Sequence, residues 1–193
     1  MINPNELTAV ILTGGQSRRM GQSKALLTLE GVSFVERIAA VASPLVQEVV
    51  VVDNGALGAA WKGAAWSDRY QGQGPVAGIE TALWNIKTPY ALVLSCDIPL
   101  MATFVLEYLI TNHIPTKTAI FVVQERWQPL IGIYAKAQQP IFERALQQQQ
   151  YRLMDVLQHI PLQLCPCPAP WGHYLSNINT PKAYQQLVHD FEH

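Results

Sequence analysis

The amino-acid sequence predicts an α/β fold built on a mostly parallel sheet. Short apolar, β-branched runs alternate along the chain with longer segments of helical periodicity, and this alternation is typical of such folds. The run from Gln47 to Asp53 contains four consecutive valines without polar alternation, which indicates a strand buried on both faces. A length of 193 residues without a break in composition favours one domain over residues 1–193.

The individual elements follow from periodicity and end signals. A buried strand is expected over Thr8–Leu12, where a Gly-Gly pair ends the apolar run. A helix is expected from Ser33, whose spacing to Glu36 is that of a capping box, through Ala42. The same criteria predict strands at 90–95, 118–124, 130–135 and 162–165, helices at 76–87, 103–113, 138–149 and 153–159, and a last helix capped by Thr180.

The composition excludes several classes of protein. Hydrophobic residues make up 49% of the chain, but no segment approaches the ~18 unbroken apolar residues of a membrane helix. A formal net charge of -1 argues against non-specific binding to nucleic acid or anionic lipid. No basic region precedes the first apolar run, and the three cysteines suit a reducing compartment. We therefore expect a cytoplasmic protein with no nucleic-acid or membrane partner.

Charge is concentrated in the loop that follows the first strand, LTGGQSRRMGQSK. Gly14 and Gly15 let the backbone approach a ligand, and Arg18, Arg19 and Lys24 add positive charge in a chain with only 14% charged residues. In open α/β sheets, ligands bind outside the carboxyl ends of the strands. The loop fits neither the P-loop nor the G-x-G-x-x-G pattern, but it has the parts of a polyphosphate-binding cradle.

A carboxylate follows another buried strand, in the stretch LSCDIPL. In a parallel sheet Asp97 would emerge on the same edge as the glycine-rich loop. A carboxylate beside phosphates is unfavourable unless a cation lies between them, and Mg²⁺ commonly binds one or two carboxylates together with phosphate oxygens. Asp97 is therefore the candidate metal ligand, and an aspartate that caps a turn is the alternative.

Three further residues are candidates for the same edge of the sheet, and two asparagines later in the chain are candidates for a shared polar face. Asp53 ends the second strand, Asp68 precedes a glycine-rich segment, and Gly78 lies in GPVAG at the start of a helix. Asn177 and Asn179 alternate in SNINTP, which would place both side chains on one face. Each of these residues also fits an ordinary turn, and a capping role is expected for Asn179 or Thr180.

Taken in order, these stretches resemble one family, the molybdenum cofactor guanylyltransferases. LTGGQSRRMGQSK is similar to the family's L-A-G-G-x-S-x-R-M-G-x-D-K signature, and DRYQGQGPVAGI is similar to its D…GPLAGI segment. LSCDIPL resembles the family's metal-binding C-D-x-P segment, and SNINTP resembles its N-x-N-T-P segment. The resemblance runs from about residue 8 to 185 and implies a single Rossmann-like, three-layer domain of the nucleotidyltransferase type, with GTP and Mg²⁺.

The resemblance also implies roles for residues near the loop. Lys24 matches the phosphate-binding lysine, Asp68 matches an aspartate of the nucleotide site, and Asp97 matches the aspartate that binds nucleotide and Mg²⁺. Asp53 aligns near a guanine-site residue, within one position. The backbone stretch that matches the family's nucleotide-binding segment comprises Leu12, Thr13, Gly14 and Gly15.

On the acceptor side, Asn177 and Asn179 match asparagines associated with molybdopterin. The chain departs from the pattern at Thr13, where alanine is usual, and at Ser23, where aspartate is common. Gln128 precedes a proline where many members have histidine, so the pterin pocket is less well predicted than the nucleotide site.

The implied reaction transfers GMP from GTP to the phosphate of Mo-molybdopterin and releases pyrophosphate. Lys24, Arg18 and Arg19 would hold the leaving pyrophosphate, while Mg²⁺ at Asp97 would bridge nucleotide oxygens. Transient contact with molybdoenzymes or cofactor-biosynthesis proteins would follow from a terminal transfer step. Two alternatives stay open: a cytidylyltransferase acting on molybdopterin or on a sugar or polyol phosphate, and a non-catalytic GTP sensor or carrier.

Overall fold

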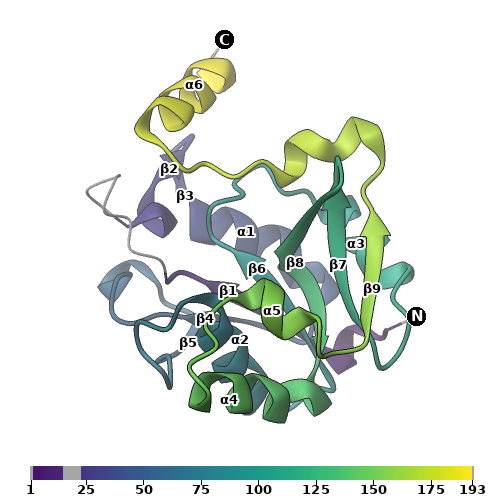
Figure 1. Ribbon diagram of the computed structural model, residues 1–193. Coiled ribbons are helices and arrows are strands. Elements are labelled where there is room, and N and C mark those ends of the chain that lie inside the picture. The colour runs from purple at the N-terminus through teal and green to yellow at the C-terminus, as the bar shows by residue number, and fades with distance from the viewer. Residues whose placement is uncertain (1, 15–22, 193) are drawn as a thin grey trace.

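The computed structural model describes residues 2–14 and 23–192 of the chain. Its centre is a seven-stranded sheet in the order β5-β4-β1-β6-β8-β7-β9 (Figure 1). Strand β8 pairs antiparallel with both of its neighbours, and all other pairs are parallel. The predicted mostly parallel sheet is confirmed. The strands are β1 Leu7–Leu12, β4 Glu48–Val52, β5 Ala64–Trp66, β6 Tyr90–Ser95, β7 Thr118–Val123, β8 Arg126–Ala135 and β9 Leu162–Pro166.

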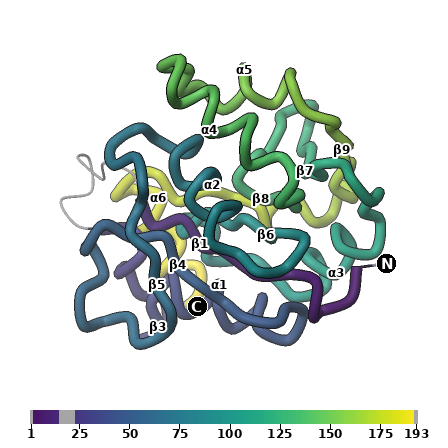
Figure 2. The backbone as a smooth tube through the Cα atoms, turned by 90° about the horizontal axis from the view of Figure 1, so that it is seen from below, coloured from purple at the N-terminus to yellow at the C-terminus, as the bar shows by residue number. Residues whose placement is uncertain are grey.

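Helices cover both faces of this sheet, which gives the predicted three layers (Figure 2). Helices α1 (Phe34–Ala42) and α3 (Thr103–Thr111) share one apolar core with the sheet. The opposite core contains α2 (Gly74–Asn85), α4 (Gln139–Gln147) and α5 (Leu153–Leu157). Because alternate residues of β1 and β6 point into the two cores, both strands are buried on both faces, as their apolar runs predict.

A third, smaller core lies under the C-terminal helix. Helix α6 (Pro181–Glu192) packs on the two-stranded hairpin of β2 (Thr28–Leu29) and β3 (Val32–Ser33), beside the main sheet in Figure 1. The Tyr184 hydroxyl donates to the Thr28 carbonyl oxygen over 2.7 Å. This packing fixes the segment that enters α6 next to the segment that follows the glycine-rich loop.

The predicted end signals are confirmed at two helices. Ser33 and Glu36 form the capping box of α1, with each side chain bonded to the backbone of the other residue. At α6 the Thr180 hydroxyl accepts a hydrogen bond from the Ala183 amide over 3.1 Å. Local sequence therefore determines where these helices begin.

Strand β8 contains the predicted strand 130–135, but it begins four residues earlier than predicted, at Arg126. The turn between β7 and β8 lies at Gln124 and Glu125, which take φ of 47° and 65°. Two central residues with positive φ are typical of a tight β-hairpin turn. The β7–β8 register jumps between Ile120 and Phe121, and Pro129 falls at this irregularity, where a missing amide is tolerated.

Two elements were not predicted at all. Strand β5 has the sequence AAW and is largely exposed at the sheet edge, so it lacks an apolar pattern. The hairpin β2–β3 has strands of two residues each, too short to show alternation. Both are ordered by neighbouring elements rather than by local sequence.

His113 gives the fold a testable pH dependence. Its ring is buried, Nε2 donates to the Lys117 carbonyl oxygen over 2.9 Å, and Nδ1 is buried without a partner among the described residues. Burial lowers the pKa of His113 in the folded protein, so the unfolded chain binds a proton on this ring more tightly than the folded chain does. We expect the free energy of unfolding to fall as pH drops below 6.5, the ordinary pKa of histidine.

Urea unfolding at pH 7.5 and pH 5.5 tests this expectation. His113→Gln should lose part of the pH dependence, whereas the matched change at exposed His159 should keep it. Equal pH dependence in the two variants would contradict a role for His113.

Candidate functional site

The site lies where the two central parallel strands end. Strands β1 and β6 are hydrogen-bonded neighbours with Leu12 opposite Ser95. The Cys96 amide donates to the Leu12 carbonyl oxygen over 3.3 Å, which extends the pairing past the strand ends. Thr13, the first residue after β1, and Asp97, the second residue after β6, are therefore brought to the same edge of the sheet.

Three polar side chains from distant parts of the chain meet at this edge. The Lys24 ammonium lies 3.3 Å from Asp97 Oδ2 and also donates to Asn179 Oδ1. Lys24 begins the short 3₁₀ helix after the glycine-rich loop, Asp97 follows β6, and Asn179 precedes α6. One cation thus joins the three segments that the sequence singled out.

Asp97 is held by more than its contact with Lys24. The Ser95 hydroxyl donates to Asp97 Oδ1 over 2.6 Å, and the Ile178 amide donates to the Asp97 backbone oxygen over 2.8 Å. The side chains of Lys24 and Asp97 are 20% and 16% exposed, so an incoming ligand can reach both. Asp97 is therefore oriented but accessible.

These oxygens fit a hard divalent cation. Asp97 Oδ2 and Asn179 Oδ1 both bond to the single Lys24 ammonium, so a positive charge between them is already accommodated. Carboxylate and amide oxygens are ligands that Mg²⁺ accepts together with phosphate oxygens. Among the described residues no cluster of three or more histidine, cysteine, aspartate or glutamate side chains could hold a metal ion. A site completed by substrate phosphates is consistent with this donor set.

Cys96, directly before Asp97, is not a nucleophile. Burial, together with the charge of Asp97, raises the pKa of its thiol to about 12. The thiol therefore stays protonated at neutral pH, and only thiolates react readily.

Asp53 organises a neighbouring loop with both carboxylate oxygens. The Thr13 hydroxyl donates to Asp53 Oδ1 over 2.7 Å, and the Gly55 and Leu57 amides donate to Oδ2 over 2.9 and 3.2 Å. Asp53 is thus near the predicted edge, but its oxygens shape the turn that follows β4. The threonine that departs from the family pattern supplies one of these bonds.

Asp68 and Gly78 lie on the α2 side of the same edge. Asp68 Oδ1 accepts hydrogen bonds from the Tyr70 amide over 3.0 Å and from the Thr81 hydroxyl over 3.3 Å. A Cβ built on Gly78 would lie 3.1 Å from a Leu12 side-chain carbon. Gly78 therefore permits close packing of α2 on β1, a structural reason besides any contact with a ligand.

The remaining predicted residues divide into two groups. Asn177 is exposed on the same extended segment as Asn179, with Ile178 buried between them, as alternation predicts. A Cβ built on Gly14 would meet no atom of the described residues within 4 Å. Gly15, Arg18 and Arg19 lie outside the described residues.

Sequence reasoning missed Ser95, Glu80 and Thr81. Ser95 is the polar end of an otherwise apolar strand, which was a usable signal. Glu80 and Thr81 interrupt an apolar helix, and both are fully buried. A buried charge in such a helix is rare without a partner, so this position carried information that the pattern analysis left unused.

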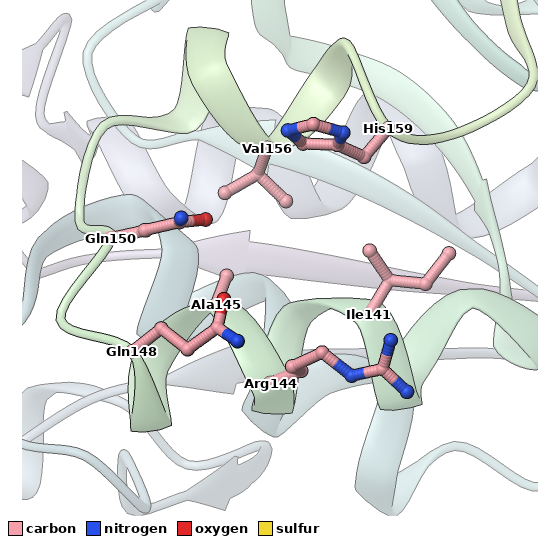
Figure 3. A pocket seen from close by; sticks show the side chains of 7 residues that line it. All are labelled: Ile141, Arg144, Ala145, Gln148, Gln150, Val156 and His159. Carbon is pink, nitrogen blue, oxygen red and sulfur yellow. The ribbon is translucent and has the colours of Figure 1, made fainter.

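A pocket of about 440 Å³ opens elsewhere, between α4 and α5 (Figure 3). Its lining includes Arg144, Gln148 and His159, and it shares no residue with the site described above.

Among the described residues, no helix is both long and apolar enough to cross a membrane.

Comparison with known proteins decides the family. The profile of the MobA-like NTP transferase domain matches residues 9–163, which contain Lys24, Asp68 and Asp97. The chain belongs to this family.

Curated relatives agree with this assignment, and a solved structure shares the fold. A "Probable molybdenum cofactor guanylyltransferase" from Carboxydothermus hydrogenoformans is 32% identical over 190 residues, covering 96% of each chain. A protein of the same name from Clostridium perfringens is 35% identical, covering 94% of this chain and 96% of the relative. The structure of molybdopterin-guanine dinucleotide biosynthesis protein A from Archaeoglobus fulgidus has a TM-score of 0.81 at 24% identity, covering 96% of this chain and 98% of that one.

The MobA-like fold is shared beyond this enzyme type. The 2-C-methyl-D-erythritol 4-phosphate cytidylyltransferase of Thermus thermophilus has a TM-score of 0.71 at 15% identity, covering 96% of this chain and 98% of that one. At this identity the likeness shows the fold alone. The predicted nucleotidyltransferase-type α/β fold is confirmed, and the chain is a nucleotidyltransferase.

Proposed function

We propose that this MobA-like protein transfers GMP from GTP to the phosphate of Mo-molybdopterin, with release of pyrophosphate. The observation that carries the proposal is the meeting of Lys24, Asp97 and Asn179 at the ends of β1 and β6. The names of its relatives support guanine and the molybdopterin acceptor. We place the reaction in the cytoplasm, with Mg²⁺ as cofactor and transient contact with molybdoenzymes or cofactor-biosynthesis proteins.

The residues divide the work between the two substrates. Lys24 would pair with phosphate oxygens of GTP and neutralise the leaving pyrophosphate, together with Arg18 and Arg19. The Asp97 carboxylate and the side-chain amide oxygen of Asn179 would hold Mg²⁺. A bound Mg²⁺ would supply charge neutralisation between the two anionic reactants. Asn177, exposed on the same extended segment, would contact the acceptor.

The reaction needs no general base from the protein. A phosphate monoester is largely deprotonated near neutral pH because its second pKa is about 6. The attacking oxygen therefore carries no proton that must be removed. The site has to orient the two substrates and screen their negative charges. The nearest thiol, Cys96, is kept protonated by burial, which agrees with this scheme.

Pyrophosphate release from GTP and from CTP, each with Mg²⁺ and Mo-molybdopterin, tests the function, with Asp97→Ala as control. Release with GTP alone, abolished in the variant, is expected. Release from CTP would keep the nucleotidyl-transfer reaction but identify the protein as a cytidylyltransferase. GTP binding without release from either nucleotide would replace the enzyme by a sensor or carrier.

A further inference from the structure

Helix α2 carries a carboxylate in the core, which none of the roles above requires. Glu80 is 0% exposed, and residues 76–83 around it are all buried. Its Oε1 accepts hydrogen bonds from Gln139 Nε2 over 2.8 Å and from Arg69. Its Oε2 is buried without a hydrogen-bond partner among the described residues. An apolar side chain would fill this space without burying an unpaired carboxylate oxygen.

Arg69, the ionic partner of Glu80, is fixed from several sides. Its guanidinium lies 3.8 Å from the centre of the Trp84 ring, and Nη2 lies 3.7 Å from Glu143 Oε1. These contacts orient a planar cation that would otherwise extend into solvent, because the Arg69 side chain is 29% exposed. Glu80 is the fully buried member of this group of side chains, so it holds the buried end of the Arg69 guanidinium in place.

Arg69 directly follows Asp68, and the neighbour of Glu80 holds the same segment. The Arg69 amide donates to the Thr81 hydroxyl over 2.9 Å, and that hydroxyl donates to Asp68 Oδ1. Glu80 and Thr81 thus bind two consecutive loop residues through two side chains of one rigid helix. Oδ1 of Asp68 is taken up by this arrangement, so the direction of the carboxylate depends on it.

Stability does not account for the buried charge. Burial raises the pKa of Glu80, while the Gln139 hydrogen bond and the Arg69 charge oppose that shift. Buried ion pairs contribute little net stability compared with apolar side chains of similar volume, so a different benefit is needed. Hydrogen bonds connect the cluster to the candidate site through the segment that contains Asp68.

We propose that Glu80 is a positioning residue for nucleotide binding, acting through Arg69 to fix the Asp68 segment. The inference rests on the proposed GTP-binding function. It assigns no contact between Glu80 and the substrate. It predicts that Glu80 affects the affinity for GTP and leaves the acceptor side unchanged.

The test compares Glu80→Gln, Arg69→Met and the double variant by GTP binding at fixed Mg²⁺. Glu80→Gln should weaken GTP binding about tenfold, which corresponds to about 1.4 kcal/mol. In the Arg69→Met background the same change should have almost no effect, because residues that act through one another are non-additive. Glu143→Gln, at the 3.7 Å end of the cluster, is the matched control and should stay within about twofold of the wild type.

Two further readouts separate positioning from folding and from the proposed function. In Glu80→Gln, hydrogen exchange at the amides of Arg69 and Tyr70 should accelerate, while exchange in β6 and the melting temperature stay unchanged. The hydrogen-exchange measurement can be made even if the wild type binds no GTP. Absence of GTP binding would reject the proposed function without deciding the role of Glu80. Additive effects in the double variant, or unchanged exchange at these amides, would overturn the role of Glu80.

Discussion

Asp97→Asn should lower the rate of GMP transfer by about three orders of magnitude, since it removes the one carboxylate at the junction of Lys24 and Asn179. The amide preserves the size of the side chain and one oxygen, but it loses the negative charge that attracts a divalent cation. The Ser95 hydroxyl can still donate to the remaining oxygen, so the local fold should persist.

Single-turnover pyrophosphate release against Mg²⁺ concentration measures this effect. The variant should need more Mg²⁺ for half-maximal rate and should stay slow at saturation, while GTP affinity changes only a few-fold. Asp155→Asn, a half-exposed carboxylate on α5, is the matched control and should behave as the wild type. Wild-type rates in Asp97→Asn would remove Asp97 from the catalytic residues.

The main elements of the fold could be predicted because local patterns were strong where burial was complete. Strands β1, β4 and β6 consist mostly of apolar residues, and Ser33 with Glu36 encodes the start of α1. Strand β5 and the hairpin β2–β3 could not be predicted, because partner strands rather than their own residues stabilise them. The exact residues of the β7–β8 turn, Gln124 and Glu125, could not be predicted, since neither is a typical choice for positive φ.

The candidate site was predictable in its parts and less so in its connections. Lys24 and Asp97 lie 73 residues apart, and the expectation of a parallel sheet was enough to predict that Asp97 and the glycine-rich loop share an edge. The position of Asn179 was not predictable, because it depends on how the segment before α6 crosses the strand ends. The resemblance associates Asn179 with the acceptor, whereas its carbonyl oxygen contacts the lysine of the nucleotide side.

Lys24→Met should reduce kcat/KM by about two to three orders of magnitude, the second-largest effect we expect. Methionine keeps an unbranched side chain of similar length and removes only the cation. Because a phosphate-binding lysine contacts the nucleotide before and during transfer, both KM for GTP and kcat should change. The Lys24–Asp97 pair is partly exposed, so the melting temperature should change little.

Magnesium dependence separates this effect from that of Asp97. In the free protein the Lys24 ammonium bonds to Asp97 Oδ2 and Asn179 Oδ1, the same oxygens that we assign to Mg²⁺. Lys24→Met frees both oxygens, so the Mg²⁺ concentration for half-maximal rate should not rise, in contrast to Asp97→Asn. A rise of equal size in both variants would mean that Lys24 acts only by orienting Asp97. A lower requirement for Mg²⁺ would mean that the lysine moves from these oxygens to the substrate phosphates when GTP and the metal bind.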